Sequence, residues 1–330
     1  MRVILPVAGV GTRLRPLTHT VPKALVHVAG KPILGHIIDS LLPLGIEEVL
    51  LVVGYLGEQV VEYVRSTYDL PVRWVEQPER KGLGHAVYLA GELWPKADEP
   101  VLIVLGDTIF SADLDGILTG ERSMIAVREV SEPSRFGIVE LDGGRIKRLV
   151  EKPSDPPSNL AIVGVYYLKS GRKLFAALEE IIRKDIKVKG EYQLTDALQL
   201  LIEQGEDIGV FKVDDWLDCG NPETLLLTNR ILLSRRNGNS EPPRKPGCII
   251  IPPVYIAPTA KVVHSIIGPY VSIADGAEVE QCILRNSIVN RHAKADNVLL
   301  ADSIIGEHAS VGGTYTKVNV GDSSDIRVTF

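Results

Sequence analysis

Residues 2–13 read RVILPVAGVGTR, a short apolar run that leads directly into a glycine-rich turn. The run from Arg2 to Val7 has the length and composition of a buried strand. Glycine lets backbone amides approach a ligand closely, so a turn of this kind after a strand suits phosphate binding, with an ordinary tight turn as the alternative. Leu14 stands where a dinucleotide fingerprint needs its third glycine, and no G-K-[ST] follows, so the turn is neither that fingerprint nor a P-loop.

Downstream of this turn, apolar runs of strand length alternate with amphipathic stretches. The pattern predicts strands at Glu48 to Val53, Val72 to Val75 and Val101 to Leu105, with helices at Pro32 to Leu44, near Glu58 to Thr67 and near Leu83 to Leu93. This order is typical of an α/β fold with a Rossmann-like, mostly parallel sheet and helices on both faces. Ligands of such sheets bind beyond the carboxyl ends of the strands, which favours the loops after Val7, Val75 and Leu105.

The pattern changes near residue 236. Residues 236–247 (RNGNSEPPRKPG) have the composition of a linker, and we expect one domain over 1–235 before it. After it, aliphatic residues recur six apart, as at Ile267, Ile273 and Val279. A six-residue period predicts a short left-handed parallel β-helix over 248–330, with a small irregular β-sandwich as the alternative.

Two irregularities interrupt this period. Three similar segments carry Ser265, Ser287 and Ser303, which are 22 and 16 residues apart. The longer spacing predicts an inserted loop in one coil. Lys294 falls where the period expects an aliphatic residue.

Composition excludes several classes of protein. The 330 residues are 45% hydrophobic and 24% charged, which is ordinary for a globular chain and excludes a disordered one. The net charge of −6 disfavours binding to a nucleic acid polymer. No apolar run approaches the ~18 residues of a membrane span, and the N-terminus shows no cleavable signal. Cys219, Cys248 and Cys282 are too few and scattered for a disulfide framework, so a reducing cytoplasm is the expected setting.

Cations cluster around the glycine-rich turn of this acidic chain. Arg13, Lys23 and Lys31 all lie within about 20 residues of the first strand's end, and together with bare amides they suit a polyphosphate. Each cation alone could be a solvated surface charge.

The stretch from Pro6 to Thr18, followed by Pro22-Lys23 and Lys31-Pro32, resembles the signature of sugar-1-phosphate nucleotidylyltransferases. The resemblance covers residues 1 to about 235, and the β-helix makes it most similar to the long, glucose-1-phosphate thymidylyltransferase-like members. It implies that Arg13 and Lys23 contact the nucleotide phosphates, and that the turn binds the nucleotide through Ala8, Gly9, Gly11 and Thr12.

Further motifs of the same resemblance assign the base and the metal. The segment from Glu76 to Ala86 is similar to the family's base-recognition loop, in which Gln77 and Gly82 would meet a pyrimidine. His85 is a residue that uridylyltransferases often have there, so the base stays open between thymine and uracil. Asp107 in an L-G-D motif and Asp218 in a W-x-D-x-G motif would be the ligands of Mg²⁺.

The sugar side is carried by three more segments. By the resemblance, Gly137, Glu151 and Gly164 would contact the sugar, and Lys152 would bind its phosphate. Residues 190–196 (GEYQLTD) look like the start of a family helix, where Thr195 and Asp196 would order the segment.

The function implied is transfer of a nucleotidyl group from a nucleoside triphosphate to a sugar 1-phosphate, with release of pyrophosphate. The first choice is dTTP with glucose 1-phosphate, and UTP is the second. The alternatives are a second, acyltransferase activity in the β-helix using His264, His292 or His308, and a non-catalytic regulatory subunit that binds nucleotide sugars. We also expect a homo-oligomer, with the β-helix as the contact.

Overall fold

The computed structural model of the chain describes residues 1–95, 97–236 and 244–313. By their internal contacts the residues form two compact units, 1–228 and 229–330. Residues 237–243 of the expected linker and residues 314–330 of the expected β-helix lie outside the described residues. Among the helices that are described, none combines the length and apolarity needed to span a bilayer.

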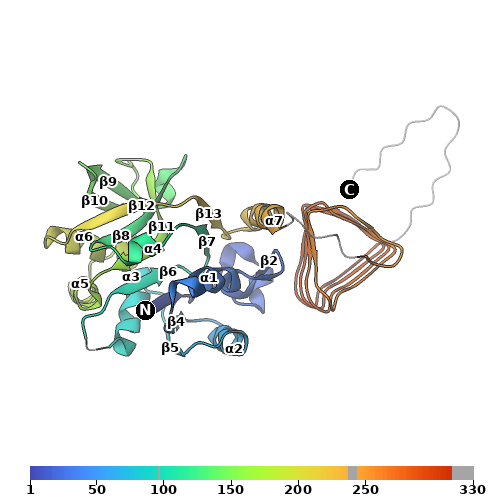
Figure 1. Cartoon of the computed structure of the whole chain (residues 1–330), viewed down its shortest axis with the longest axis horizontal. Helices are drawn as coiled ribbons and strands as arrows, with labels where there is room; N and C mark the ends of the chain where they lie inside the picture. The colour runs from blue at the N-terminus through green and yellow to red at the C-terminus, as the bar shows by residue number, and fades with distance from the viewer. Residues whose placement is uncertain (96, 237–243, 314–330) are drawn as a thin grey trace. The chain divides into compact units, whose positions relative to one another are not determined.

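The first unit is built on a nine-stranded sheet whose main path runs β10-β9-β11-β6-β1-β4-β5 (Figure 1). Its parallel part consists of β1 (Arg2–Pro6), β4 (Glu48–Val53), β5 (Val72–Glu76) and β6 (Val101–Val104). These are the strands that the alternating pattern predicts. The pairing of β1 with both β4 and β6 is parallel, so all four carboxyl ends lie at one edge.

The other half of the sheet is antiparallel around β11. The strands there are β8 (Ser123–Glu129), β9 (Gly137–Asp142), β10 (Arg145–Glu151), β11 (Leu160–Leu168) and β12 (Ile208–Lys212). β11 runs antiparallel to β6, β8 and β9, whereas β12 is parallel to β8. The sheet is therefore mixed, with its parallel part as predicted.

Helices cover both faces of the sheet. The helices are α1 (Ile33–Leu41), α2 (Gly57–Thr67), α3 (Leu83–Ala90), α4 (Asp115–Leu118), α5 (Gly171–Arg183), α6 (Leu194–Glu203) and α7 (Pro222–Arg236). Ile4 and Leu50 point to the face covered by α3, α5 and α6. Val3 and Val49 lie on the opposite face with Ile38 of α1, because side chains alternate along a strand.

Short elements complete the unit. The 3₁₀ turns are Thr12–Leu14, Leu17–His19, Lys23–Leu25, Leu42–Leu44, Gly91–Leu93 and Pro133–Arg135. β2 (His27–Val28) pairs with β3 (Lys31–Pro32), and β7 (Thr108–Ser111) pairs antiparallel with β13 (Asp215–Asp218). The β7–β13 ribbon brings together two segments that are distant in sequence.

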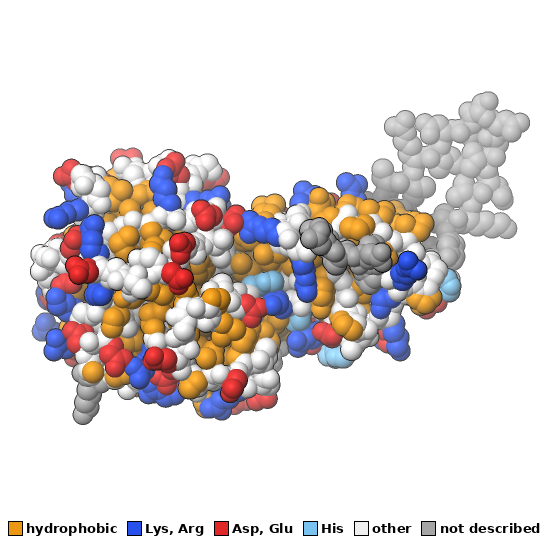
Figure 2. Space-filling view, in the orientation of Figure 1, with side chains coloured by type: hydrophobic (Ala, Val, Ile, Leu, Met, Phe, Trp, Pro, Cys, Tyr) orange, Lys and Arg blue, Asp and Glu red, His pale blue; other side chains and the backbone are white. Residues whose placement is uncertain are grey.

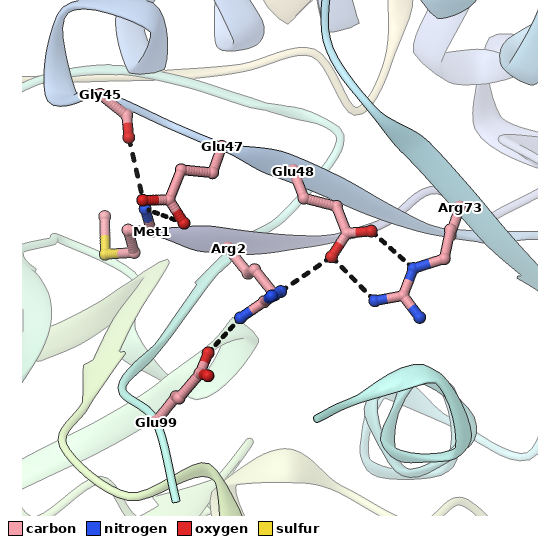
Figure 3. Close-up of polar contacts among 7 residues, drawn as sticks. All are labelled: Met1, Arg2, Gly45, Glu47, Glu48, Arg73 and Glu99. Carbon is pink, nitrogen blue, oxygen red and sulfur yellow. Dashed lines mark hydrogen bonds and ion pairs between the residues drawn. The ribbon is translucent and has the colours of Figure 1, made fainter. Parts of the chain in front are cut away.

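An ion-pair network ties the amino ends of the parallel strands (Figure 3). Glu48 of β4 accepts hydrogen bonds from Arg73 of β5 at 2.6 and 2.8 Å and from Arg2 of β1 at 2.9 Å. Arg2 also pairs with Glu99. Although burial opposes it, hydrogen bonding to Arg73 and then to Arg2 holds the pKa of Glu48 below its ordinary value.

The second unit is a β-helix, whose triangular outline Figure 1 shows. Each of its three sides is a four-stranded parallel sheet. Side A consists of β14 (Ile249–Ile250), β17 (Ile266–Ile267), β20 (Ile283–Arg285) and β23 (Leu299–Ala301). Side B consists of β15 (Val254–Ile256), β18 (Val271–Ile273), β21 (Ile288–Val289) and β24 (Ile304–Ile305). Side C consists of β16 (Lys261–Val263), β19 (Glu278–Glu280), β22 (Lys294–Asp296) and β25 (Ser310–Gly312). The predicted β-helix is confirmed and the β-sandwich is wrong.

The expected loop insertion is also wrong. Successive strands of one side are offset by 16 or 17 residues throughout, as in the pairs Val254–Val271 and Ser272–Ile288. Ser265 precedes a strand of side A, whereas Ser287 precedes one of side B, so their 22-residue spacing is one coil plus one side.

Lys294 does not break the core. The interior position next to it is Ala295, which stacks between Val279 and Val311 and is buried. Lys294 points outward and forms an ion pair with Glu278 at 3.4 Å. Val289, the preceding inward residue, is six positions before Ala295, so the six-residue spacing holds at this corner.

Candidate active site

A pocket of about 310 Å³ opens at the carboxyl edge of the parallel strands. Its walls come from the loops that follow β1, β5 and β6, which is where the sequence places ligand binding. The predicted residues among its lining are Ala8, Gly9, Lys23, Gln77, Gly82 and Asp107. Gly9 faces open space, since a Cβ atom added there would meet nothing within 4 Å.

The glycine-rich turn is shaped around Lys23. Gly11 has a left-handed φ of 68°, and a Cβ atom there would lie 2.9 Å from the Cβ of Lys23. Thr18 fixes the turn by donating its hydroxyl hydrogen bond to the carbonyl of Gly11 at 2.8 Å. Gly11 therefore acts through backbone shape, because a side chain at that position would displace the lysine. Lys31, in contrast, pairs with Asp39 and lines neither this pocket nor the second one described below.

Lys23 and Asp107 form an ion pair at the back of this pocket, with 2.6 Å between Nζ and Oδ2. Asp107 follows β6, and the β7–β13 pairing sets Thr108 opposite Asp218. The amide of Cys219 donates to the carbonyl of Asp107, and the charge of Asp107 acts on the pKa of Asp218, so the two residues lie near each other. Arg13 joins them, because both its guanidinium and the Asp218 carboxylate lie against Gly220.

The two carboxylates have different electrostatics. Burial acts to raise the pKa of Asp107, but the charge and hydrogen bond of Lys23 hold that pKa below its ordinary value. The pKa of Asp218 is raised by burial and then by the negative charge of Asp107, against the opposing effect of Lys23, Arg13 and Arg135. Two neighbouring carboxylates are a ligand pair that a divalent cation can use.

The donor set fits Mg²⁺ that substrate helps to hold. Among the described residues, no group of three or more His, Cys, Asp or Glu side chains could bind a metal ion by itself. Mg²⁺ is commonly held by one or two carboxylates, with phosphate oxygens and waters as the other ligands. Asp107 and Asp218 supply two carboxylates at a place where two pockets meet.

The far wall of the first pocket is organised by a buried glutamine. Gln77 donates from its side-chain amide to the carbonyl of Gly82 at 3.1 Å and lies 3.1 Å from Nδ1 of His85. Gly82 has a φ of 101°, and a Cβ atom there would lie 2.5 Å from the carbonyl of Tyr192. Burial, and then Lys81, lower the pKa of His85, which favours its neutral form. The pocket therefore ends in neutral hydrogen-bonding groups.

A second pocket of about 320 Å³ adjoins the first. The two share Leu83, Leu105, Asp107 and Glu191, and the second also holds Arg13, Arg135, Gly137, Glu151, Lys152 and Asp218. Asp107 therefore stands at the junction of the two pockets.

Glu151 and its neighbours are tightly packed in this second pocket. The β9–β10 register sets Gly137 opposite Glu151, and a Cβ atom on Gly137 would lie 2.9 Å from Oε2 of Glu151. The hydroxyl of Thr195 donates to the same oxygen at 2.7 Å. Lys152 lies 3.4 Å from Oε1 of Glu151 and has a φ of 43°. A left-handed lysine is strained, and strain of this kind tends to occur at functional sites.

Not every predicted residue lies on a pocket wall. Gly164 packs against Leu105, whose side chain would be 2.7 Å from an added Cβ atom, while Ile162, Val163 and Tyr166 line the second pocket. The glycine permits the bulge in β11 that turns these neighbours inward.

Sequence reasoning left out several lining residues. Glu191 faces both pockets, and Tyr166 and Trp216 line the second. All three belong to segments that the resemblance singles out, so membership of those segments was the available signal. In the β-helix, His292 and His308 stack with ring centroids 5.0 Å apart at one corner, whereas His264 occupies another. The three histidines are not brought together.

Comparison with known proteins agrees with this geometry. A family model described as "Nucleotidyl transferase" matches residues 2–235. UTP–glucose-1-phosphate uridylyltransferase AglF of Haloferax volcanii is 38% identical over 233 residues, which cover 68% of this chain and 93% of the relative.

Two further proteins extend the likeness. Glucose-1-phosphate thymidylyltransferase of Streptomyces antibioticus is 31% identical over 362 aligned residues, which cover 99% of each chain. The crystal structure of UDP-glucose pyrophosphorylase complexed with UDP-glucose is similar with a TM-score of 0.58 and 27% identity, over 71% of this chain and 99% of that chain.

Proposed function

Because this chain belongs to the nucleotidyl transferase family, we propose that it makes a nucleotide sugar from glucose 1-phosphate and a pyrimidine nucleoside triphosphate, with dTTP as first choice and UTP as second. The chain is a sugar-1-phosphate nucleotidyltransferase of the thymidylyl- or uridylyltransferase type. The base and the sugar are the parts that we propose. The observation that carries the proposal is the junction of two pockets at Asp107.

The reaction joins two anions, so the chain must offset charge and align the reacting atoms. An oxygen of the sugar 1-phosphate attacks the α-phosphorus, and the bond from that phosphorus to the bridging oxygen of pyrophosphate breaks. Arg13 and Lys23 stabilise the triphosphate and the leaving pyrophosphate, while Lys152 positions the attacking phosphate in the second pocket. Such charge stabilisation in a partly enclosed site is usually the largest contribution to the rate.

Asp107 and Asp218 would hold Mg²⁺, which neutralises charge on the α-phosphate when it is bound. Lys23 pairs with Asp107 in the structure, so its ammonium group lies close to where the phosphates would bind. When no divalent cation is bound, the positive charge of Lys23 offsets the repulsion between the carboxylates of Asp107 and Asp218. When the nucleotide binds, the same positive charge stabilises its phosphates.

Pyrimidine recognition is supported by the end of the first pocket. Gln77 and Gly82 line this pocket, and a side-chain amide has both the donor and the acceptor that the imide edge of thymine or uracil needs; to use its donor, Gln77 would exchange its present hydrogen bond to the Gly82 carbonyl for one to the base. The full-length likeness to a protein named for thymidylyl transfer supports dTTP, whereas the higher identity to a protein named for uridylyl transfer keeps UTP second.

Pyrophosphate release across a grid of substrates tests the proposal. The grid crosses dTTP, UTP, CTP, ATP and GTP with the 1-phosphates of glucose, galactose and N-acetylglucosamine, with and without Mg²⁺. We expect the highest kcat/KM for dTTP with glucose 1-phosphate, lower values for UTP, and no release without Mg²⁺. A preference for a purine triphosphate would contradict the base assignment, and no release from any pair would support the regulatory-subunit alternative.

A further inference from the structure

A histidine that lies on neither pocket wall is the partner of the glutamine at the end of the first pocket. His85 is the third residue of α3 and is half-buried, whereas Gln77 follows β5 and is only 6% exposed. Nε2 of Gln77 lies 3.1 Å from Nδ1 of His85 and 3.1 Å from the carbonyl oxygen of Gly82. Gln77 lines the first pocket and His85 lines neither pocket, so an effect of His85 on a ligand has to pass through Gln77.

Hydrogen-bond chemistry fixes the orientation of these three groups. The carbonyl oxygen of Gly82 can only accept, so the amide atom of Gln77 that faces it is the nitrogen and not Oε1. That nitrogen can only donate, so Nδ1 of His85 is an acceptor and the proton of the neutral ring lies on Nε2. Burial, and then Lys81, hold the pKa of His85 below its ordinary value, which favours the neutral ring that has such an acceptor.

Both hydrogens of the Gln77 amide are therefore used inside the protein. The group that stays available is Oε1, which accepts no hydrogen bond from the described residues and is not sealed from solvent. The backbone amide of Gly82 likewise donates to none of the described residues. Gln77 and Gly82 thus present an acceptor beside a donor, which is the complement of an N–H group beside a carbonyl.

The first turn of α3 is held in place by a segment that is distant in sequence. The amide of Gly84 donates to the carbonyl of Tyr192 at 2.8 Å, and the amide of Tyr192 donates to the carbonyl of Lys81 at 2.8 Å. The rings of His85 and Tyr192 stack with their centroids 6.4 Å apart and 29° between their planes. These contacts fix the imidazole against which the Gln77 amide is oriented.

We propose that His85 is a positioning residue for base selection: by accepting the second hydrogen of the Gln77 amide, it leaves Gln77 only Oε1 to offer, so that the site selects a base with an N–H group at its edge. The inference rests on the proposed pyrimidine substrate and adds the residue that excludes cytosine. Uracil and thymine carry a hydrogen on N3, whereas N3 of cytosine is a bare acceptor. Gln77 then keeps its hydrogen bond to Gly82 while the base is bound.

The exclusion of cytosine follows from repulsion as well as from a missing contact. With the base held in one position by its ribose and triphosphate, cytosine would set the lone pair of N3 against Oε1 of Gln77. Two acceptors that face each other in a partly enclosed site leave both unpaired, which is more costly than losing one contact. Without an acceptor at His85, the second hydrogen of the amide is free, and the amide can turn to meet either base.

Binding and turnover of dTTP, UTP and CTP by the full chain test the proposal. Isothermal titration calorimetry gives the Kd of each triphosphate, and pyrophosphate release with glucose 1-phosphate gives KM and kcat. His85→Leu should raise Kd and KM for dTTP and UTP about tenfold and shrink their advantage over CTP by a similar factor, with kcat unchanged. His85→Gln offers an acceptor oxygen again and should recover most of the discrimination.

Two further variants separate positioning from a general loosening of α3. Tyr88→Leu is the matched control, because it removes another half-buried ring about one turn further along the same helix. It should leave the preference for UTP over CTP unchanged. In a Gln77→Ala background, His85→Leu should change that preference no further, because His85 acts only through Gln77. Circular dichroism shows whether each variant keeps the fold.

The results that overturn this inference differ from those that overturn the proposed function. If the wild type prefers dTTP or UTP and His85→Leu keeps full discrimination against CTP, the positioning role is wrong and the proposed function stands. The positioning role is equally wrong if His85→Gln is no better than His85→Leu, or if the effects of Gln77→Ala and His85→Leu add in full. A wild type that binds CTP or a purine triphosphate more tightly than dTTP and UTP overturns the base assignment and this inference together.

Discussion

Lys23 connects the two loops on which the site depends. Its ammonium group lies 2.6 Å from Asp107, its stem packs under Gly11, and it opposes the pKa rise that Asp107 causes in Asp218. One side chain therefore shapes the phosphate-binding turn and balances the carboxylate pair. This combination explains why the lysine is buried although it is charged.

Lys23→Met should lower pyrophosphate release about 10²–10³-fold, because it removes a charge-assisted contact from a partly enclosed site. Steady-state kinetics at saturating Mg²⁺ measure the effect. Lys23→Arg keeps the charge but not the geometry, and it should retain more activity than the methionine variant. Equal activity in Lys23→Met and wild type would show that the Lys23–Asp107 pair is merely structural.

Asp196 is the most unfavourably placed carboxylate near the site. Its Oδ2 is buried with no hydrogen-bond partner, and burial followed by the charge of Glu151 raises its pKa to about 6. A carboxyl with a raised pKa in the folded state destabilises the fold once both states are ionised, which is above pH 6. At neutral pH the ionised Asp196 therefore lowers the free energy of unfolding.

Asp196→Asn should raise the free energy of unfolding by about 1–2 kcal/mol at pH 8, and the gain should shrink as the pH falls from 6 to 4. Urea unfolding followed by tryptophan fluorescence measures it, since Trp74, Trp94 and Trp216 all belong to the first unit. The same change at the exposed Asp69 is the control. A gain that is independent of pH would mean that the Asp196 charge is not its cause.

At the scale of elements, the amino edge of the parallel strands is held by Glu48. Its lowered pKa means that the Arg2–Glu48–Arg73 network stabilises the fold above the ordinary pKa of glutamate and loses that contribution as the pH falls through the folded-state value. The network joins β1, β4 and β5 at the end opposite the active site. It stabilises the sheet at a place where substitution does not touch substrate.

Glu48→Gln should lower the free energy of unfolding by about 1–2 kcal/mol at pH 7 and by much less below pH 4. Urea unfolding at the two pH values provides the measurement. Glu47→Gln is the control, because the Glu47 side chain is 73% exposed and, among the described residues, forms an ion pair only with the N-terminal amine. A Glu48→Gln effect that persists undiminished at low pH would contradict the electrostatic explanation.

Local patterns predict the elements of the parallel half well. Strands such as β4 and helices such as α1 bury residues at periods of 2 and 3.6, and each pattern lies within one segment of sequence. The antiparallel half depends on pairing between distant strands, of which the sequence pattern gives little sign. The β-helix shows the same limit, because the six-residue period is identical on all three sides and does not tell Ser265 on side A from Ser287 on side B.

The residues of the candidate site likewise divide into those that local patterns place and those that depend on pairing between distant segments. Gly9, Gln77 and Asp107 closely follow predicted strands, so sheet topology alone places them near one another. Asp218 is 111 positions from Asp107, and only the β7–β13 ribbon joins them. Their proximity was implied by resemblance and not by any local pattern. The roles assigned to these residues stay predictions until substrate and metal are tested.

At the scale of the whole molecule, charge is distributed rather than concentrated. Figure 2 shows lysine, arginine and acidic side chains interspersed over the face in view, with no broad area of one sign. A net charge of −6 gives polyanions no general attraction, so binding of a triphosphate must come from the local cluster around Arg13 and Lys23.

The central claim is that Asp107 and Asp218 act together on a divalent cation where the two pockets meet. Pyrophosphate release by Asp107→Asn and Asp218→Asn, titrated with Mg²⁺ at saturating dTTP and glucose 1-phosphate, tests it most directly. The account predicts that each variant keeps its circular dichroism spectrum but loses at least about 10²-fold in turnover, and that the double variant is little worse than either single one. Full turnover in either single variant, with unchanged dependence on Mg²⁺, would contradict the claim.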